Sequence, residues 1–414
     1  MIISRLHFLL LFVFGIVDSN TALGQGNEPF IVGRVWEATS KAPAKFANVY
    51  FKNSGLGTIS NEDGLFKLLI PAESSTDTLI VSFVGFKPQR VGIALLSLGD
   101  TLLISLQESV TELNPIEVTA LSPLVLLQKA LRSTSAKSLT PAILNTYYRE
   151  FVSKNGHYIK FADALVDYFI QYRADDFPEV DVKITESRAK SVPYNTGAKS
   201  LGDIEIPEPI NLEILPRFFD IEKKFEVRFN PLDYEFESYD ETDGKRDFYK
   251  IQFKPKSNVA KVLYKGNFLI DKVNEIIHSV EYEIPDENVK YIEVRNLLGV
   301  KFQVSKAKVY VQFQMIGDKC HLKYAKATLG VHVYNKKDYN VTHLFTSEML
   351  VNKVGSNIEQ YSNREKYKKN SIYKRGNNYQ TPFWKGQRAL LATEEEERII
   401  KTLQAGSKNQ QQRR

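Results

Sequence analysis

Two residues in the second half of the chain have the spacing of a metal-binding pair. His278 and Glu281 form an H-x-x-E sequence within residues 274–284. That segment alternates apolar and polar residues, which predicts a strand with Ile276 and Val280 on its apolar face. His278 is expected on this apolar face and Glu281 on the other, whereas ligands must converge within about 2 to 2.2 Å of one ion. The pair is therefore not expected to bind a metal.

Three further histidines form a regular series. His321, His332 and His343 follow one another at intervals of eleven residues, which could align them on neighbouring strands. The expected faces differ, because His332 shares its face with polar residues such as Lys326 and Thr328, whereas His343 shares its face with the apolar Val341 and Phe345. We interpret these histidines as separate surface or core residues, and we predict no metal and no other cofactor.

Cys320 is the only cysteine of the chain. A single cysteine excludes an intramolecular disulfide. It lies beside His321, but no base occurs in a recognisable sequence context for a catalytic thiol. We expect a thiol without a catalytic role.

Asn61, Glu62 and Asp63 place three oxygen-bearing side chains next to one another, before Gly64. A calcium site needs about six to eight oxygen ligands. Asp-Gly also marks a tight turn, because glycine accepts a positive φ. The sequence predicts a structural turn in which Gly64 has a positive φ.

Basic and aromatic residues alternate between Asn363 and Arg375. Such a segment can hold phosphates or sugars, and a solvated connector has a similar composition. If it binds an anion or a glycan, the expected contact residues are Arg364, Lys366, Tyr367, Lys368, Lys369, Tyr373, Lys374 and Arg375. After it, Pro382-Phe383-Trp384 is expected to anchor the chain on the sheet.

The overall charge restricts the classes of partner. Lysine and arginine exceed aspartate and glutamate to give a net charge of +6. For an exported chain this favours anionic glycans or phospholipid head groups, or has no specific meaning. Nucleic acid is not expected as a partner outside the cytoplasm, and composition does not determine the oligomeric state.

The N-terminal residues have the layout of a secretory signal peptide. Arg5 and His7 precede an apolar run from Phe8 to Val17, which is too short to span a bilayer. Small residues follow, so we expect cleavage after Gly24. No cysteine stands directly after the apolar run, where a lipid-modified cysteine would have to lie, and this argues against a lipoprotein.

Short β-rich runs separated by Gly, Pro, Asn and Asp turns occupy residues 28–107 and predict a small antiparallel β-sandwich. The expected strands are Ile31 to Trp36, Ala47 to Phe51, Gly64 to Ile70, Thr78 to Phe83 and Thr101 to Leu106. The order G-x-V, P-x-x-x-A-N-V, G-T-x-S-N-E-D-G-x-F and S-x-V-G-F-K resembles the carboxypeptidase-regulatory-like domain, a transthyretin-like module of bacterial envelope proteins. The resemblance implies an envelope location more than an activity. A zinc carboxypeptidase is not expected, because its ligands have no recognisable motif here.

A larger domain is expected to follow the linker 108–122. Ser122 and Pro123 suit a helix start, so Leu124 to Ser138 is predicted to be helical. Asn155-Gly156 is a strong hairpin signal. Later segments such as Ala307 to Met315 alternate apolar and polar residues, which predicts antiparallel strands that each have one wet face. We interpret Asp175 to Pro231 as an excursion with short helical pieces.

The predicted fold class is mostly β, with β and α+β parts: a transthyretin-like β-sandwich, then a larger curved antiparallel sheet with few helices over residues 123–385. Residues 386–414 are expected to form a short helix, Glu394 to Leu403, and a tail. The predicted order of a helix, a hairpin and a long meander, together with the sequence of Gly266 to Ile277, resembles the half-barrel of periplasmic lipoprotein carriers. The sequence of Asn145 to Ile159 resembles that of a family of uncharacterised envelope proteins. In this family the regulatory-like module precedes a large antiparallel sheet.

These observations lead to one functional hypothesis with two alternatives. We expect an exported, non-enzymatic protein of a Gram-negative cell envelope, in the periplasm or associated with the outer membrane. Its partner would be a glycan, a lipid or an outer-membrane protein. The first alternative is a periplasmic lipid carrier with a half-barrel fold. Its apolar cavity would be lined by the faces that hold Val309, Val311 and Phe313 and Ile276, Val280 and Tyr282, which in the preferred interpretation pack against the helix instead. The second is a hydrolase whose carboxylates would be Asp175, Asp176, Glu179 and Asp181.

Overall fold

The computed structural model describes most of the chain from Pro29 to Thr402. The described ranges are 29–53, 56–70, 76–95, 100–109, 121–171, 179–194, 209, 212, 214–226, 230–356, 366–368, 371–375, 390–394 and 396–402. Among these residues, no helix combines the length and the apolar character that crossing a membrane requires.

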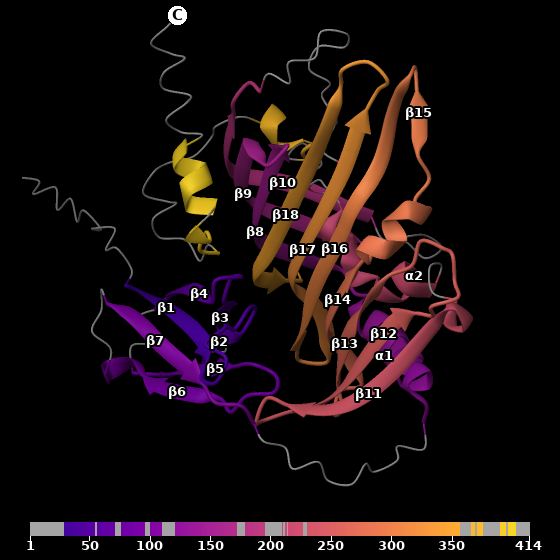
Figure 1. The fold of residues 1–414 in the computed structure, drawn as a ribbon. Coiled ribbons are helices and arrows are strands. Elements are labelled where there is room, and N and C mark those ends of the chain that lie inside the picture. Colours follow the sequence, from indigo (N-terminus) through magenta and orange to yellow (C-terminus); the bar gives the residue numbers. More distant parts are fainter. Residues whose placement is uncertain are drawn as a thin grey trace, which may run out of the picture.

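The N-terminal domain is a sandwich of two small sheets, which lies at the lower left of Figure 1. One sheet has the order β4-β1-β7 and the other β3-β2-β5-β6. The strands are β1 (Phe30–Glu37), β2 (Asn48–Phe51), β3 (Gly57–Ile59), β4 (Leu65–Leu69), β5 (Thr78–Ser82), β6 (Gln89–Gly92) and β7 (Thr101–Leu106). The five expected strands are present. β1 and β7 pair in parallel, however, so the prediction of a purely antiparallel sandwich is wrong.

The turn before β4 confirms the prediction for Gly64. Its φ is 75°, and a Cβ atom built there would lie 2.2 Å from the carbonyl oxygen of Val35. The side chain of Asn61 closes the turn, because its Oδ1 accepts hydrogen bonds from the backbone N–H groups of Asp63 and Leu65, both at 2.9 Å. The side-chain oxygen of Asn61 therefore serves the turn.

The second domain begins with helix α1 (Pro123–Ser138). Ser122 is its N-cap and accepts a hydrogen bond from the backbone N–H of Val125, while Pro123 occupies the first turn, as the sequence predicts. Leu126, Leu127, Ala130 and Leu131 are buried along one stripe of the helix.

A large antiparallel sheet forms the body of the second domain (Figure 1). Its eleven strands have the order β10-β9-β8-β18-β17-β16-β14-β13-β12-β11, and β15 pairs with β16 at one side. The strands are β8 (Ala142–Lys154), β9 (His157–Gln171), β10 (Glu179–Ser191), β11 (Tyr234–Thr242), β12 (Asp247–Pro255), β13 (Lys265–Asp271), β14 (Ile276–Glu283), β15 (Arg295–Leu297), β16 (Val300–Ile316), β17 (Lys319–Tyr334) and β18 (Asn340–Gly355).

The hairpin between β8 and β9 confirms the Asn-Gly prediction, with φ values of 49° at Asn155 and 79° at Gly156. The described residues of the Asp175 to Pro231 region are only partly helical. They include η3 (Leu215–Phe219), α2 (Ile221–Glu226) and the start of η4 (Pro231–Asp233), but also the strand β10. The interpretation of this region as an excursion was wrong for β10, which pairs with β9 as a regular part of the sheet. The register of this pairing shifts after Ile184, and the shift interrupts the alternation of apolar and polar residues.

One face of the large sheet, here called the inner face, packs against α1, η3 and α2. Val280, Val311 and Phe313 are almost completely buried in the same hydrophobic cluster as Leu127 and Leu131 of α1. Phe225 of α2 adds edge-on contacts with Phe268 and Tyr282. The side chains that would have lined a carrier cavity therefore pack against the helices.

The opposite face, here called the outer face, was expected to be wet. The sandwich and the C-terminal residues 390–402 cover much of it instead (Figure 1). Gln312, predicted on the wet face, is only 1% exposed because the sandwich lies against it. The prediction of a solvent-exposed face is therefore wrong where the two domains meet.

Candidate ligand-binding groove

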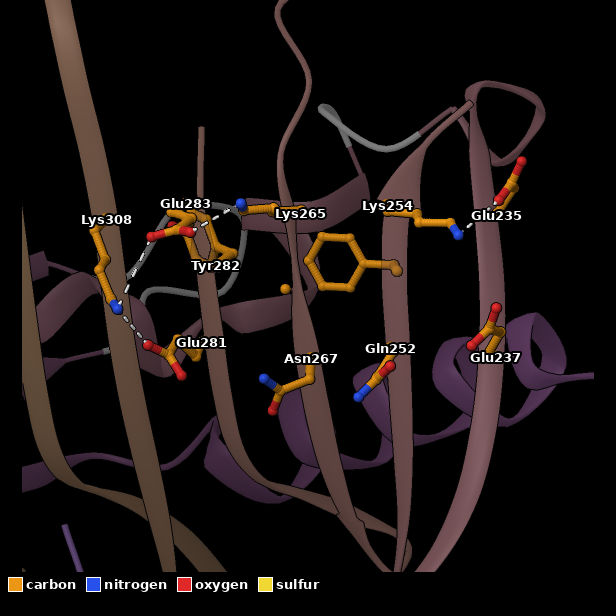
Figure 2. A pocket seen from close by; sticks show the side chains of 12 residues that line it. Glu235, Glu237, Gln252, Lys254, Lys265, Asn267, Glu281, Tyr282, Glu283 and Lys308 are labelled. Atoms are coloured by element: carbon orange, nitrogen blue, oxygen red, sulfur yellow. Dashed lines mark ion pairs between the residues drawn. The ribbon is translucent and has the colours of Figure 1, made fainter. Parts of the chain in front are cut away.

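Two adjoining depressions lie on the outer face and together form what we call the groove. The first is a trough of 360 Å³ across β11, β12, β13, β14 and β16, shown in Figure 2. The second is the interdomain cleft, of 510 Å³, between the sandwich and the same strands. Asn267, Glu281 and Lys308 line both, so the two depressions are continuous.

Strand alternation places the polar side chains in the trough. On β12 and β14, Phe253 and Val280 point to the buried inner face, so their neighbours Gln252, Lys254 and Glu281 point outward. Figure 2 shows charges of opposite sign on neighbouring strands. Four ion pairs cross between strands: Lys254 with Glu235 at 3.2 Å, Lys265 with Glu283 at 3.4 Å, and Lys308 with Glu281 at 2.7 Å and with Glu283 at 3.9 Å.

Lys308 stands where the trough meets the cleft. Burial alone would lower the pKa of its ammonium group, but the hydrogen bond and the charge of Glu281, with Glu283, raise it above its ordinary value. Lys308 is therefore a charged donor at neutral pH.

The interdomain cleft balances positive and negative charges. Its walls carry four carboxylates, Glu37, Glu62, Glu241 and Glu281, and four lysines, Lys45, Lys250, Lys308 and Lys326. Aromatic side chains from both domains, Phe46, Phe83 and Tyr310, complete it. A site of this composition offers many hydrogen-bonding groups with little net charge, next to aromatic faces.

Phe46 is the aromatic contact of the sandwich with the sheet. Its ring stacks on Tyr310 of β16, with centroids 4.3 Å apart, and lies 5.4 Å from Tyr324 of β17. Its φ is 61°, in the left-handed region that non-glycine residues seldom adopt. Sequence reasoning did not identify Phe46, because its partners are on strands far along the chain.

A buried polar contact lies beside this stack. Gln312 donates from Nε2 to Oδ1 of Asn48 in the sandwich at 3.3 Å, and the Lys323 ammonium group donates to the same oxygen. Lys323 sits at a register shift between β16 and β17 that turns it toward the sandwich. Burial, with the nearby Arg246, lowers the pKa of Lys323 to about 7.

His278 does not lie on the face predicted for it. The pairing of β13 with β14 shifts between Leu269 and Ile270, and this irregularity turns His278 to the outer face. There its Nε2 is 3.5 Å from Nε2 of Gln312, and its ring is 5.1 Å from that of Phe248. Burial lowers the pKa of His278 well below its usual range, and Arg246 and Lys323 add to the effect.

The other candidate metal ligands lie apart. His332 is half-buried and its Nε2 contacts Asn340 at 2.6 Å, whereas His343 is buried with a pKa lowered to about 4 by burial and by Lys154 and Lys160. Cys320 is buried, which raises the pKa of its thiol to about 11. Within the described part of the chain, no three histidine, cysteine or acidic side chains come together as a metal site.

The predicted basic and aromatic segment lies along the β10 edge of the sheet. Tyr367 donates from its backbone N–H to Val182 at 2.6 Å and from its hydroxyl to Ser371, and the ammonium group of Lys366 pairs with Asp181. Tyr373 packs beside Lys160 within η8 (Ile372–Lys374), and Arg375 and Lys368 are exposed. Arg364, Lys369 and the Pro382-Phe383-Trp384 anchor lie outside the described residues. Anion binding by this segment stays a prediction.

The carboxylates of the hydrolase alternative are only partly described. Asp175 and Asp176 lie outside the described residues, and Glu179 and Asp181 belong to β10. Asp181 is buried and paired with Lys366.

Sequence reasoning also missed a buried charged cluster on the outer face. Arg149 of β8 donates from Nε to Glu348 of β18 at 2.6 Å, and its Nη2 lies 3.1 Å from Oε2 of Glu396. Tyr324 donates its hydroxyl to Glu348 at 2.7 Å. Burial alone would raise the pKa of Glu348, but Arg149 and Lys326 outweigh it and lower the value.

The C-terminal residues connect this cluster to the sandwich. Thr393 and Glu396 form a reciprocal capping box, with the Thr393 N–H donating to Glu396 at 2.8 Å and the Glu396 N–H donating to Thr393 at 3.1 Å. Residues 394 and 396–402 are helical, as predicted. Asn61 and Asp63 of the sandwich turn bind this segment through Leu391 and Glu394.

Comparison with known proteins gives one family match and several distant structural similarities. A DUF1329 family protein from Desulfovibrio piger is 10% identical, with a TM-score of 0.24, over 58% of this chain and 96% of that one. A LolA superfamily protein from Nitrosomonas europaea is 10% identical, with a TM-score of 0.18, over 54% and 92%. A structure titled "Lipid-protein interactions in lipovitellin" is 8% identical, with a TM-score of 0.24, over 52% of this chain and only 26% of that chain.

No curated protein matches the chain at a significant level. The family match concerns the N-terminal domain, where residues 31–118 fit the model of the CarboxypepD_reg-like domain. This match covers the sandwich and agrees with the strand and turn motifs of the sequence. The chain therefore carries a carboxypeptidase-regulatory-like domain at residues 31–118.

Proposed function

We propose that the chain is an exported, non-enzymatic protein of the cell envelope that binds a glycan in the groove between its two domains. The observation that carries the proposal is the interdomain cleft, whose four carboxylates and four lysines balance one another beside Phe46 and Tyr310. Sugars present hydroxyl groups that need donors and acceptors, and C–H faces that pack on aromatic rings.

The charge balance favours a glycan over the other partner classes considered. A fatty acyl chain would take the charged side chains of the cleft out of water without offering them hydrogen bonds, which is costly. A strongly anionic polymer would meet as many carboxylates as lysines in the cleft. The packing of Val311 and Phe313 against the α1 cluster gives no support to the carrier alternative.

Affinity electrophoresis of the mature chain tests the proposal. The protein is run in native gels with and without a β-glucan, a xylan, a mannan or soluble peptidoglycan fragments. We expect one of these to retard it, and we expect Asn267→Ala and Glu281→Gln each to weaken the retardation roughly tenfold, because hydrogen bonds to charged or polar ligand groups are lost. Glu287→Gln, in the exposed turn η5 (Asp286–Tyr291), is the matched control.

Two results would contradict the proposal. One is an equal retardation of the wild-type chain and of both groove variants. The other is recovery of the polysaccharide in shortened form, which would favour the hydrolase alternative.

A further inference from the structure

The β15–β16 hairpin ends in two exposed leucines. Leu297 is 64% exposed and Leu298 is 96% exposed. Val294 and Tyr291, just before the hairpin, are also exposed. Figure 1 shows this hairpin at the end of the sheet that is far from the sandwich. The tip is therefore an apolar projection from the body of the protein.

Leu298 is also an unfavourable residue for its turn. Leu297 pairs with Val300, so Leu298 and Gly299 form a two-residue turn, with φ values of 52° and 84°. Such a turn needs a positive φ at both positions and favours Asn-Gly or Asp-Gly. Leucine rarely adopts this conformation. Neither the backbone nor burial accounts for a leucine here, which points to a contact outside the chain.

Basic side chains surround the two leucines. An open notch of 530 Å³ separates the hairpin tip from the β17–β18 turn, and its walls include Leu298, Lys301, Lys336 and Lys337. Lys301 lies over the ring of Tyr334, 5.7 Å from its centroid. Arg295 adds a further positive charge, while Glu293 before the hairpin and Asp338 in the β17–β18 turn are acidic.

We propose that this tip docks on the surface of an anionic phospholipid bilayer. Leu297 and Leu298 would enter the boundary between head groups and acyl chains, and the lysines of the notch would contact lipid phosphates. An apolar projection within a basic ring is complementary to such a surface, because apolar burial and attraction to anionic lipid add together. Docking through this tip would leave the sandwich at the end of the sheet that is far from the membrane.

Vesicle co-sedimentation of the full chain tests the proposal. The vesicles are phosphatidylcholine alone or an equimolar mixture of phosphatidylcholine and phosphatidylglycerol. We expect binding to the anionic vesicles and little binding to the neutral ones. Lys336→Glu with Lys337→Glu should reduce binding at least about 25-fold, because the loss of each lysine alone costs about fivefold and each glutamate adds repulsion from the anionic lipid. The double variant Lys52→Glu with Lys87→Glu changes the net charge equally on the sandwich and should bind as the wild type does.

Leu298→Asn separates docking from folding. Asparagine suits the turn, so the melting temperature should stay the same or rise, whereas vesicle binding should fall roughly tenfold because the leucine no longer leaves water. Leu95→Asn, at a leucine 85% exposed in the sandwich, is the control and should leave binding unchanged. Unchanged binding of Leu298→Asn, or equal binding of the wild type to both vesicle types, would overturn the proposal.

Discussion

The ring of Phe46 lies on the ring of Tyr310, with centroids 4.3 Å apart and planes 17° from parallel, although the two residues belong to different domains. Tyr310 lines the interdomain cleft together with Phe46, so the stack that joins the domains is also part of the groove. We therefore expect the proposed binding in the groove and the relative position of the domains to depend on the same pair of side chains.

Phe46→Asn should loosen the contact between the domains without unfolding the sandwich. Asparagine tolerates the left-handed backbone at this position, but it removes an aromatic stack worth about 0.5 to 1.5 kcal/mol beyond its buried area. Thermal unfolding of the full chain should become less cooperative, with a separate transition for the sandwich. Lys41→Asn, at an exposed residue with φ 60° in the same domain, is the matched control and should unfold as the wild type does. A single unchanged transition in Phe46→Asn would show that other contacts couple the domains.

Gly64→Asn should destabilise the sandwich although asparagine accepts a positive φ. A Cβ atom would lie 2.2 Å from the Val35 carbonyl oxygen, so the turn or β1 must move, at a cost of about 1 to 3 kcal/mol. Gly156→Asn has nearly the same φ, but its Cβ would meet nothing within 4 Å, and it should change the free energy of unfolding little. Denaturant unfolding measures both, and equal losses would mean that the clash at Gly64 is relieved without cost.

Arg149→Ala should destabilise the second domain strongly. It leaves Glu348 and Glu396 buried without their shared cation, and breaking a buried pair in this way costs about 3 to 5 kcal/mol. Lys129→Ala removes the exposed pair with Glu275, whose side chains are 54% and 51% exposed, and should cost less than about 1 kcal/mol. Urea denaturation gives both values. Similar losses in the two variants would contradict the importance assigned to the buried cluster.

The stability of the second domain should fall in mild acid because of His343. Burial and the nearby lysines lower its pKa to about 4 from an ordinary value of 6.5. Between these values the unfolded chain binds more protons than the folded one, so the free energy of unfolding decreases as pH falls from about 6.5 toward 4. His343→Leu should reduce this dependence, and denaturant midpoints across this pH range would measure it. An identical pH dependence in the variant would assign the effect to other groups.

The sequence predicts the elements whose signals are local. The N-cap at Ser122, the Asn155-Gly156 hairpin and the turn at Gly64 each depend on a few adjacent residues, and the structure confirms them. The register shift that turns His278 outward has no such local signal, because it depends on the pairing of β14 with β13. The strand β10 was missed for a related reason, since its own register shift breaks the alternation.

The groove was beyond sequence reasoning because it forms between segments far apart in the chain. Phe46 and Glu62 come from the sandwich, and Tyr310 and Lys326 from strands of the large sheet. The alternation correctly places Lys308 and Tyr310 of β16 on the face that was predicted to be wet. Nothing in that alternation indicates that a second domain lies over part of the face. The burial of Gln312 follows from this arrangement.

Lysine footprinting tests the central claim most directly. The chain is acetylated with and without the polysaccharide that retards it most, and the modified lysines are quantified by mass spectrometry. We predict that the ligand protects Lys45 on the sandwich wall and Lys250 and Lys308 on the sheet wall of the groove, while Lys129 on α1 and Lys336 in the β17–β18 turn react as before. Protection of one wall alone, or protection at Lys129 or Lys336 in place of the groove lysines, would contradict a glycan site between the domains.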